Sequence, residues 1–206
     1  FGGGTPSLTP PALLADILAE LHSTQGVEPD AEITLEMDPG TFDADRLARY
    51  IDSGVSRVSL GVQSFDAELL KKAGRAHSLE DVEKALGLLE SAPRKLHVSI
   101  DLISGLPFQT MESWRASLAI AAQAPGVGHV SVYDLQVEQG TAFGRWYTPG
   151  AFPLPDEKRA ADMFREASSI LGSAGFDHYE VSSYARPGNR CIHNRAYWAN
   201  EPFWGF

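Results

Sequence analysis

The chain has 206 residues, of which 43% are hydrophobic and 21% charged, and this composition is that of an ordinary globular α/β domain with a sizeable core. Its formal net charge of -10 excludes a general nucleic-acid or anionic-membrane surface, because such surfaces need clustered lysine and arginine. No run of about eighteen apolar residues occurs, so no transmembrane segment is predicted, and Cys191, the only cysteine, excludes an internal disulfide.

Strand and helix patterns alternate along the chain. Phe1 is expected to be the last residue of a strand that begins earlier, and the glycines Gly2, Gly3 and Gly4 follow it. Thr9 is a suitable N-cap with Pro10 at the first helical position. An apolar stripe with helical spacing comes next: Leu13, Leu14, Ile17, Leu18 and Leu21. Further helices are predicted from Asp43, from a capping box at Ser78, over 110–124 and over 156–171, and strands over 31–36, 57–63, 95–103, 127–134 and 176–182.

This alternation predicts βα units around a parallel sheet, in one domain that covers residues 1–206. A longer loop with glycine and proline is expected over 136–155. A C-terminal extension is expected to start at about residue 183 and to be irregular, with short helical turns.

The two faces of the predicted strands differ in polarity. One parity is apolar: Ile33, Leu35, Val58, Leu60, Val62, Val98, Ile100, Leu102, Val130 and Val132. The other is small or polar: Thr34, Glu36, Ser59, Gly61, Gln63, Ser99, Asp101, Ser131 and Tyr133. Because a flat doubly wound sheet needs apolar residues on both faces, the pattern favours a full or partial (β/α) barrel with a polar interior. Glu36, Gln63 and Asp101 lie towards the C-terminal strand ends, where α/β folds bind ligands.

The glycines leave backbone amides that a ligand can touch directly. Gly-rich turns between a strand and a helix often bind anions, and the alternative is a flexible or purely structural turn. The acidic Glu36 and Asp101 argue against a polyanion and favour a ligand with an ammonium group and hydroxyls, such as an amino acid joined to a ribose. These side chains can instead hydrogen-bond loop backbones at the barrel rim.

Four ordered motifs then identify a family. FGGGTPS (1–7), GVSRVSLGVQSF (54–65), GRAH (74–77) and DLISGLP (101–107) together resemble the radical S-adenosylmethionine core of the coproporphyrinogen-oxidase-like proteins. The resemblance covers nearly the whole chain. It implies a partial (β/α) barrel of the radical SAM type, with parallel strands inside and helices outside.

Two branches of that family compete. One contains the oxygen-independent coproporphyrinogen oxidases, which decarboxylate propionate side chains, and the other contains the HemW-type haem chaperones. QSF (63–65) stands where the oxidases tend to carry Gln-Asp-Phe, whereas YEVSSYA (179–185) and HNRAYW (193–198) are similar to the chaperone motifs. Segments 36–41 and 133–141 look most like the version found in photosynthetic lineages.

The resemblance also implies residue roles. Gly2, Gly3, Gly4 and Thr5 match the motif that contacts the methionyl amino and carboxylate groups of S-adenosylmethionine. Glu36, Gln63, Arg75 and Asp101 match positions that bind the rest of that cofactor, and Gln136 or its neighbour lies where a later strand reaches the adenine. Arg75 suits a carboxylate. The structural alternatives are a solvent-exposed charge for Arg75 and a rim hydrogen bond for Gln63.

One part of the family pattern is missing. The Cys-x-x-x-Cys-x-x-Cys loop that binds the family's [4Fe–4S] cluster precedes the Gly-rich motif, and Cys191 lies too far along the chain to be one of those ligands. We therefore interpret the chain as a fragment truncated at its N-terminus, with no metal ligands of its own and with the cluster cysteines expected upstream of Phe1. By itself the fragment is expected to be chemically inert.

His193 and Tyr197 are four residues apart, so on a helical turn they share a face. Histidine is a common axial haem ligand and tyrosine an occasional one. The alternative is that His193 and Trp198 pack a local corner. The resemblance implies that His193 and Tyr197 contact haem.

Three functions follow from these observations. The leading one is a radical-SAM haem chaperone that passes haem to haem-accepting proteins. The second is a coproporphyrinogen III dehydrogenase that oxidises a porphyrin precursor, and the third is a barrel with a phosphate-binding Gly loop and no radical chemistry. The expected location is the cytoplasm, or a plastid or mitochondrion where a transit peptide has been removed. Whether the chain forms a homodimer stays open.

Overall fold

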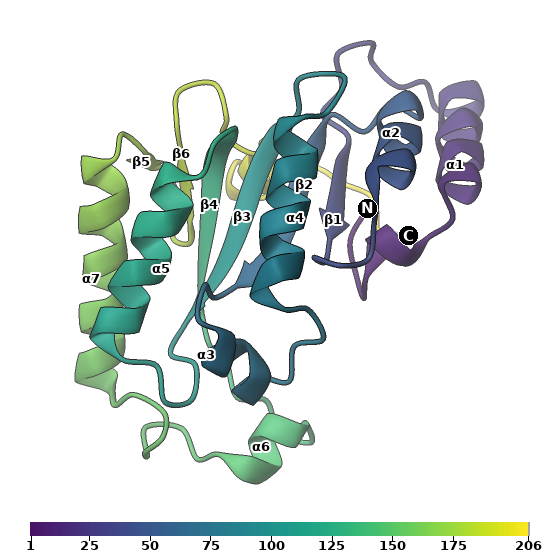
Figure 1. Cartoon of the computed structure of the whole chain (residues 1–206). Coiled ribbons are helices and arrows are strands. Elements are labelled where there is room, and N and C mark those ends of the chain that lie inside the picture. Colours follow the sequence, from purple (N-terminus) through teal and green to yellow (C-terminus); the bar gives the residue numbers. More distant parts are fainter. Residues whose placement is uncertain (206) are drawn as a thin grey trace.

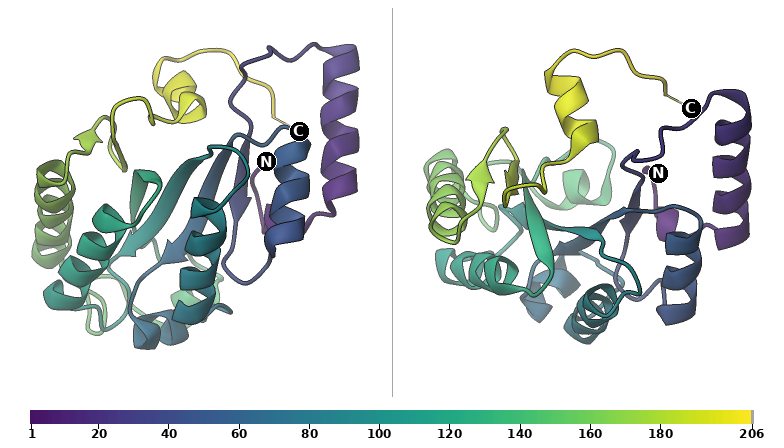
Figure 2. Two further views of the ribbon diagram at one scale, coloured as in Figure 1. Left: turned by 45° about the horizontal axis from the view of Figure 1, so that its top comes forward. Right: turned by 90° about the horizontal axis from the view of Figure 1, so that it is seen from above.

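The computed structural model describes residues 1–205 and is built on a six-stranded sheet with the order β1-β2-β3-β4-β6-β5 (Figure 1). The strands are β1 (Thr34–Met37), β2 (Arg57–Gln63), β3 (His97–Ser104), β4 (Val127–Asp134), β5 (Asp177–His178) and β6 (Ser183–Ala185). β1 to β4 are parallel neighbours in chain order. β1 and β5 form the two edges and do not meet, so the sheet is curved but not closed, which confirms the predicted α/β partial barrel (Figure 2).

Helices surround this sheet. They are η1 (Pro6–Leu8), α1 (Pro11–Thr24), α2 (Ala44–Asp52), α3 (Ala67–Lys72), α4 (Leu79–Glu90), α5 (Met111–Gln123), α6 (Ala142–Trp146), α7 (Glu157–Ser173) and α8 (Ile192–Trp198). Seen from above, α2, α4, α5 and α7 lie on one side of the strands, whereas α8 lies on the opposite, concave side (Figure 2). Among residues 1–205, no helix is long and apolar enough to cross a membrane.

Local capping begins most of the predicted helices where expected. The Asp43 side chain accepts from the Arg46 amide, and Ser78 with Asp81 forms a complete capping box. Thr9 is an exception, because α1 begins at Pro11 and Thr9 makes no side-chain cap. The Thr9 carbonyl instead accepts hydrogen bonds from the α2 side chains Tyr50 and Arg46, and these bonds connect η1 to α2.

The predicted apolar parity forms the core. Val58, Leu60, Ile100, Leu102 and Val130 have no exposed surface, and they pack against the helices on the convex side. The α1 stripe is narrower than predicted. Leu14 and Leu18 are buried, whereas 49% of Leu13 and 38% of Ile17 stay exposed.

The end of the chain differs from its prediction. The strand expected over 176–182 is reduced to the two residues of β5, and the chain then reverses into β6, which pairs antiparallel with both β4 and β5. The reversal is held by the Tyr179 amide, which donates to the Ser183 carbonyl at 3.2 Å. Two further short helices, α3 and α6, lie within segments where no helix was predicted. Phe1 pairs alongside β1, since its carbonyl accepts from the Glu36 amide at 3.1 Å.

Candidate functional site

A hollow of about 130 Å³ opens on the concave side at the C-terminal ends of β1, β2 and β3. Its lining residues are Gly4, Thr5, Pro6, Glu36, Met37, Asp38, Ser59, Gly61, Gln63, Arg75 and Asp101. Most of the residues predicted from the sequence to bind a cofactor therefore meet at one place. Asp38, Ser59 and Gly61 join them without having been predicted.

The glycine stretch lies against this hollow with a bare backbone. Gly3 and Gly4 have φ angles of 82° and 67°, a region that favours glycine, and no heavy atom lies within 4 Å of the place where a Cβ would stand. Gly2 is instead crowded, because a Cβ there would lie 2.9 Å from the Glu36 Oε1 atom. The backbone of Gly3 and Gly4 is thus accessible to a ligand, next to the Glu36 carboxylate.

Asp101 is held by serines of the polar parity. Ser59 Oγ donates to both Asp101 carboxylate oxygens, at 3.0 and 2.8 Å, and Ser99 Oγ donates to Asp101 Oδ1 at 3.4 Å. Burial raises the pKa of the Asp101 carboxyl, and the nearby Glu36 adds to that shift. Hydrogen bonds from Ser131 and Ser59 and the positive charge of Arg57 oppose it. A cationic or hydroxyl-bearing ligand would relieve this buried charge.

Gln63 ends β2 in a strained conformation. Its φ is 69°, and the Ser64 amide donates to the Val62 carbonyl at 2.9 Å, which closes a three-residue turn around it. A non-glycine residue in this region costs on the order of 1–3 kcal/mol and occurs most often at functional sites. The turn brings the side-chain amide of Gln63 back over Gly61. A Cβ atom at Gly61 would lie 2.9 Å from Gln63 Nε2.

Arg75 lies in the turn between α3 and α4, half-buried at the edge of the hollow. Its guanidinium makes no hydrogen bond or ion pair with any of residues 1–205, so it is free to meet a ligand carboxylate. His77 anchors the same turn, with Nδ1 2.9 Å from Asp38 Oδ1 and Nε2 3.2 Å from the Val62 carbonyl. Through these two contacts His77 joins the ends of β1 and β2.

α8 brings the second group of predicted residues close to the first. The rings of His193 and Tyr197 are in edge-to-face contact, with centroids 4.7 Å apart. His193 is exposed and lines a mostly apolar hollow of about 410 Å³ together with Phe1, Gly2 and Glu36. Glu36 also lines the hollow at the strand ends, so the two hollows adjoin.

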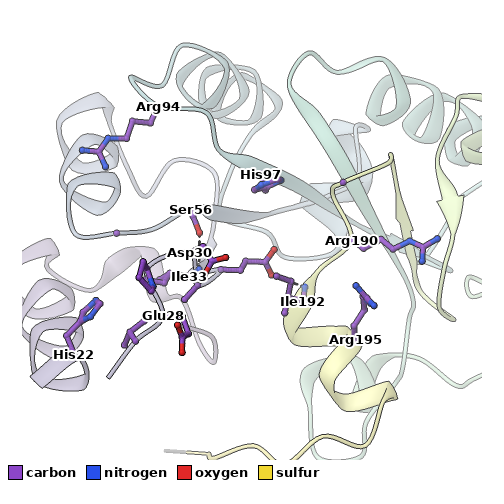
Figure 3. A pocket seen from close by; sticks show the side chains of 16 residues that line it. His22, Glu28, Asp30, Ile33, Ser56, Arg94, His97, Arg190, Ile192 and Arg195 are labelled. Atoms are coloured by element: carbon purple, nitrogen blue, oxygen red, sulfur yellow. Dashed lines mark hydrogen bonds between the residues drawn. The ribbon is translucent and has the colours of Figure 1, made fainter. Parts of the chain in front are cut away.

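Gln136 is not part of either hollow. It is exposed and lines a separate recess of about 250 Å³ with Gly105, Leu135 and Leu154. Another hollow, of about 680 Å³, lies at the opposite ends of the strands and is lined by Arg94, His97, Arg190 and Arg195 (Figure 3). It contains none of the predicted site residues. Ligands of parallel α/β folds bind at the C-terminal strand ends, which favours the small hollow.

The donor set of that hollow fits S-adenosylmethionine in part. Carboxylates suit an ammonium group or ribose hydroxyls, the Arg75 guanidinium suits a carboxylate, and bare glycine backbone allows close approach. Three carboxylates against one guanidinium do not suit a polyanion such as a phosphate chain. The volume is below the roughly 300–1,000 Å³ of whole-ligand pockets, so it accommodates one end of such a molecule. A [4Fe–4S] cluster is not accommodated, since it needs several thiolates and the sequence has one cysteine.

Comparisons with known proteins identify the family of this chain. The model of the radical SAM superfamily matches residues 1–120. The heme chaperone HemW of Synechocystis is 45% identical over 205 residues, which is 100% of this chain and 49% of that protein. The bovine mitochondrial radical S-adenosyl methionine domain-containing protein 1 is 40% identical over 96% of this chain and 44% of its own length. The chain thus spans about half the length of the curated relatives it matches.

A solved structure of a radical SAM enzyme also matches this chain. Coproporphyrinogen III oxidase (HemN) from Escherichia coli, described as a radical SAM enzyme, superposes with a TM-score of 0.79. It is 28% identical in sequence, and the match covers 96% of this chain and 44% of that one.

Proposed function

Because the chain belongs to the radical SAM superfamily, we propose that it is the S-adenosylmethionine-binding core of a haem chaperone, which receives haem and passes it to haem proteins. One observation carries the proposal: Glu36 lines both the hollow of the predicted cofactor residues and the hollow beside His193. The predicted cofactor residues and the predicted haem residues, far apart in the sequence, therefore lie side by side.

Each residue of the cofactor hollow has a proposed role. Gly2, Gly3, Gly4 and Thr5 bring bare backbone to the methionyl amino and carboxylate groups. Arg75 receives the carboxylate, and Glu36 and Asp101 receive the ammonium and the ribose hydroxyls. Gln63 orients the nucleoside side through its strained turn. When bound next to a reduced [4Fe–4S] cluster, S-adenosylmethionine supplies radical chemistry, and the residues of this chain hold and orient it.

The haem residues are proposed on chemical grounds. An exposed imidazole at the mouth of a mostly apolar hollow suits a planar, apolar ligand whose iron needs an axial nitrogen. Tyr197 packs edge-on against His193 and fixes the ring. The bovine relative is named as mitochondrial, and we propose the cytoplasm or an organelle as the location of this protein too.

The cofactor role of Arg75 is tested by equilibrium binding of S-adenosylmethionine to the protein expressed from its complete reading frame. A charge-assisted hydrogen bond contributes about 1.5–3 kcal/mol, so Arg75→Ala should weaken binding by roughly ten- to a hundredfold. The exposed Arg94, which lines the hollow at the opposite strand ends, provides the control Arg94→Ala. Equal affinities of the two variants would remove Arg75 from the site.

The haem role is tested by titrating haem into the same protein and recording its absorption spectrum. His193→Ala should weaken binding and change the spectrum of the bound iron, whereas the exposed His22→Ala on α1 should behave like the parent. Undiminished binding and an unchanged spectrum in His193→Ala would exclude His193 as the ligand.

A second function is favoured by the structural likeness to the Escherichia coli coproporphyrinogen III oxidase. In that case the same cofactor hollow would serve the oxidative decarboxylation of a porphyrinogen. Turnover of coproporphyrinogen III under anaerobic, reducing conditions would support it. A reconstituted protein that binds S-adenosylmethionine and its cluster but turns over no porphyrinogen would exclude it.

A further inference from the structure

A continuous chain of hydrogen bonds connects the cofactor hollow to the beginning of α8. Its members are Asp101 and Ser99 on β3, His129 on β4, Tyr179 after β5, and the backbone amide of Cys191 before α8. Ser99 Oγ lies 3.4 Å from Asp101 Oδ1 and 2.7 Å from His129 Nδ1. His129 Nε2 lies 2.8 Å from the Tyr179 hydroxyl, to which the Cys191 amide donates at 3.1 Å.

One proton arrangement satisfies every polar hydrogen of this chain. Burial, reinforced by the positive charge of Arg57, lowers the pKa of His129 to about 3, so the ring is neutral and carries one N–H. Tyr179 accepts from Cys191, and its own proton finds an acceptor when it is donated to His129 Nε2. The ring then donates from Nδ1 to Ser99, and Ser99 donates to Asp101. In the reverse arrangement Ser99 would donate to His129, and Asp101 would lose this donor.

We call this series of hydrogen bonds, from Asp101 to the Cys191 amide, the relay. Most of its members are buried away from water. Ser99 has no exposed surface, His129 is 1% exposed and Cys191 is 6% exposed. The rings of His129 and Tyr179 also meet edge to face, with centroids 5.7 Å apart. In such surroundings successive hydrogen bonds polarise one another, and the strength of one depends on the next.

The far end of the relay sits in a small group of contacts that hold the start of α8 over the concave face (Figure 2). The buried Arg57 donates to the Asn189 carbonyl at 3.2 Å, and the Ile192 amide donates to Glu32 Oε1 at 3.0 Å. Ile192 is labelled at this junction in Figure 3. Because Cys191 comes two residues before His193, a change in the hydrogen bond that holds the Cys191 amide moves the predicted haem ligand.

We propose that His129 and Tyr179 are positioning residues that couple the cofactor hollow to α8, so that a ligand on Asp101 strengthens the hold on α8 and tightens haem binding. The inference rests on the proposed function. An ammonium or hydroxyl group on Asp101 keeps the carboxylate ionised, hence a strong acceptor at the end of the relay. Each hydroxyl and ring N–H of the relay then donates in the direction of Asp101, and the hydrogen bond from the Cys191 amide to the Tyr179 hydroxyl becomes stronger. By linkage, haem tightens the binding of S-adenosylmethionine by the same factor.

The coupling is measured as the ratio of haem dissociation constants without and with saturating S-adenosylmethionine, in the protein expressed from its complete reading frame. Typical coupling corresponds to about 5- to 150-fold, and we expect the lower part of that range. Tyr179→Phe should reduce the ratio to nearly one. Tyr184→Phe is the matched control, because the buried Tyr184 hydroxyl has no hydrogen-bond partner among residues 1–205.

A second measurement needs no ligand. Ser99→Ala breaks the relay at a residue that does not contact α8. Hydrogen exchange of the backbone amides in 189–198 should then become several-fold faster than in the parent. Tyr179→Phe should show the same increase, and Tyr184→Phe should not. Unchanged exchange in Ser99→Ala would overturn the coupling, and so would a ratio of one in the parent with both ligands bound. Failure of either ligand to bind the parent would instead overturn the proposed function, while the exchange measurement still decides on the relay.

Discussion

Ser59 Oγ donates to both carboxylate oxygens of Asp101 from the neighbouring strand, at 2.8 and 3.0 Å. The parallel register places Ser59 opposite Ser99 on one side of Asp101, and Ser131 of β4 opposite Asp101 itself on the other. Asp101 also lines the hollow. Asp101 has no ion-pair partner among residues 1–205, and the burial that raises its pKa stores electrostatic energy that a cationic ligand can release.

The first prediction concerns this stored energy. Burial raises the Asp101 pKa, so at neutral pH the ionised group is less favourable in the folded chain than in the unfolded chain. Asp101→Asn should therefore raise the free energy of unfolding by about 1 kcal/mol while it weakens S-adenosylmethionine binding. Urea denaturation and equilibrium binding measure the two effects, and the exposed Asp52→Asn should change neither. A variant that loses stability and binding together would contradict the prediction.

The second prediction uses two glycines. Gly61→Ala places a methyl group 2.9 Å from Gln63 Nε2, the end of a flexible side chain, so the fold survives but Gln63 is displaced. S-adenosylmethionine affinity should fall several-fold. Gly87→Ala in α4 meets no atom within 4 Å and should leave binding intact while it stabilises the helix by about 0.5–1 kcal/mol. Equal binding by the two variants would show that Gln63 does not contact the ligand.

The third prediction concerns the strained turn at Gln63. Glycine adopts a φ of 69° without strain, so Gln63→Gly should leave the free energy of unfolding unchanged or raise it by up to about 1 kcal/mol. The same variant should bind S-adenosylmethionine more weakly, because it lacks the side-chain amide. Thermal denaturation and calorimetric titration separate the two effects. Marked destabilisation would indicate that Gln63 is kept for packing rather than for a ligand.

The fourth prediction is a pH dependence caused by His129. Its pKa is lowered from 6.5 to about 3, so between these values the unfolded chain binds a proton that the folded chain does not. The free energy of unfolding therefore falls as the pH falls, by about 2 kcal/mol from pH 7 to pH 5 for this one group. His129→Gln removes this contribution and should flatten the profile. Parallel profiles of the variant and the parent would assign the pH dependence to groups other than His129.

Much of the fold could be predicted because its determinants are local. The alternating polarity of the strands identified the concave face, and side-chain caps at Asp43, Ser78 and Thr110 began helices where they were expected. The reversal after β5 could not be predicted in the same way. It depends on the pairing of β6 with β4, which lies about fifty residues earlier, as the partner residues Val130 and Tyr184 show.

The predicted site was incomplete for a related reason. Glu36, Gln63, Arg75 and Asp101 were found from their place at strand ends and in one motif. Ser59 was predicted on the polar interior face, but its hydrogen bonds to Asp101 became visible only through the pairing of strands, and Asp38 was not predicted. His129 was not among the predicted site residues, because nothing near it in sequence indicates contact with Ser99 or Tyr179. Gln136 was placed by the order of strands, and the structure puts it in a separate recess.

The strand order of the sheet also bears on how the chain is made. β1 to β4 pair in the order in which a ribosome releases them, so each new strand finds its partner already present. The start of α8 depends on Glu32 and Arg57, which lie at the first two strands, and on Tyr179, which follows β5. Synthesis therefore finishes the hollow at the strand ends before α8 and His193 are fixed beside it.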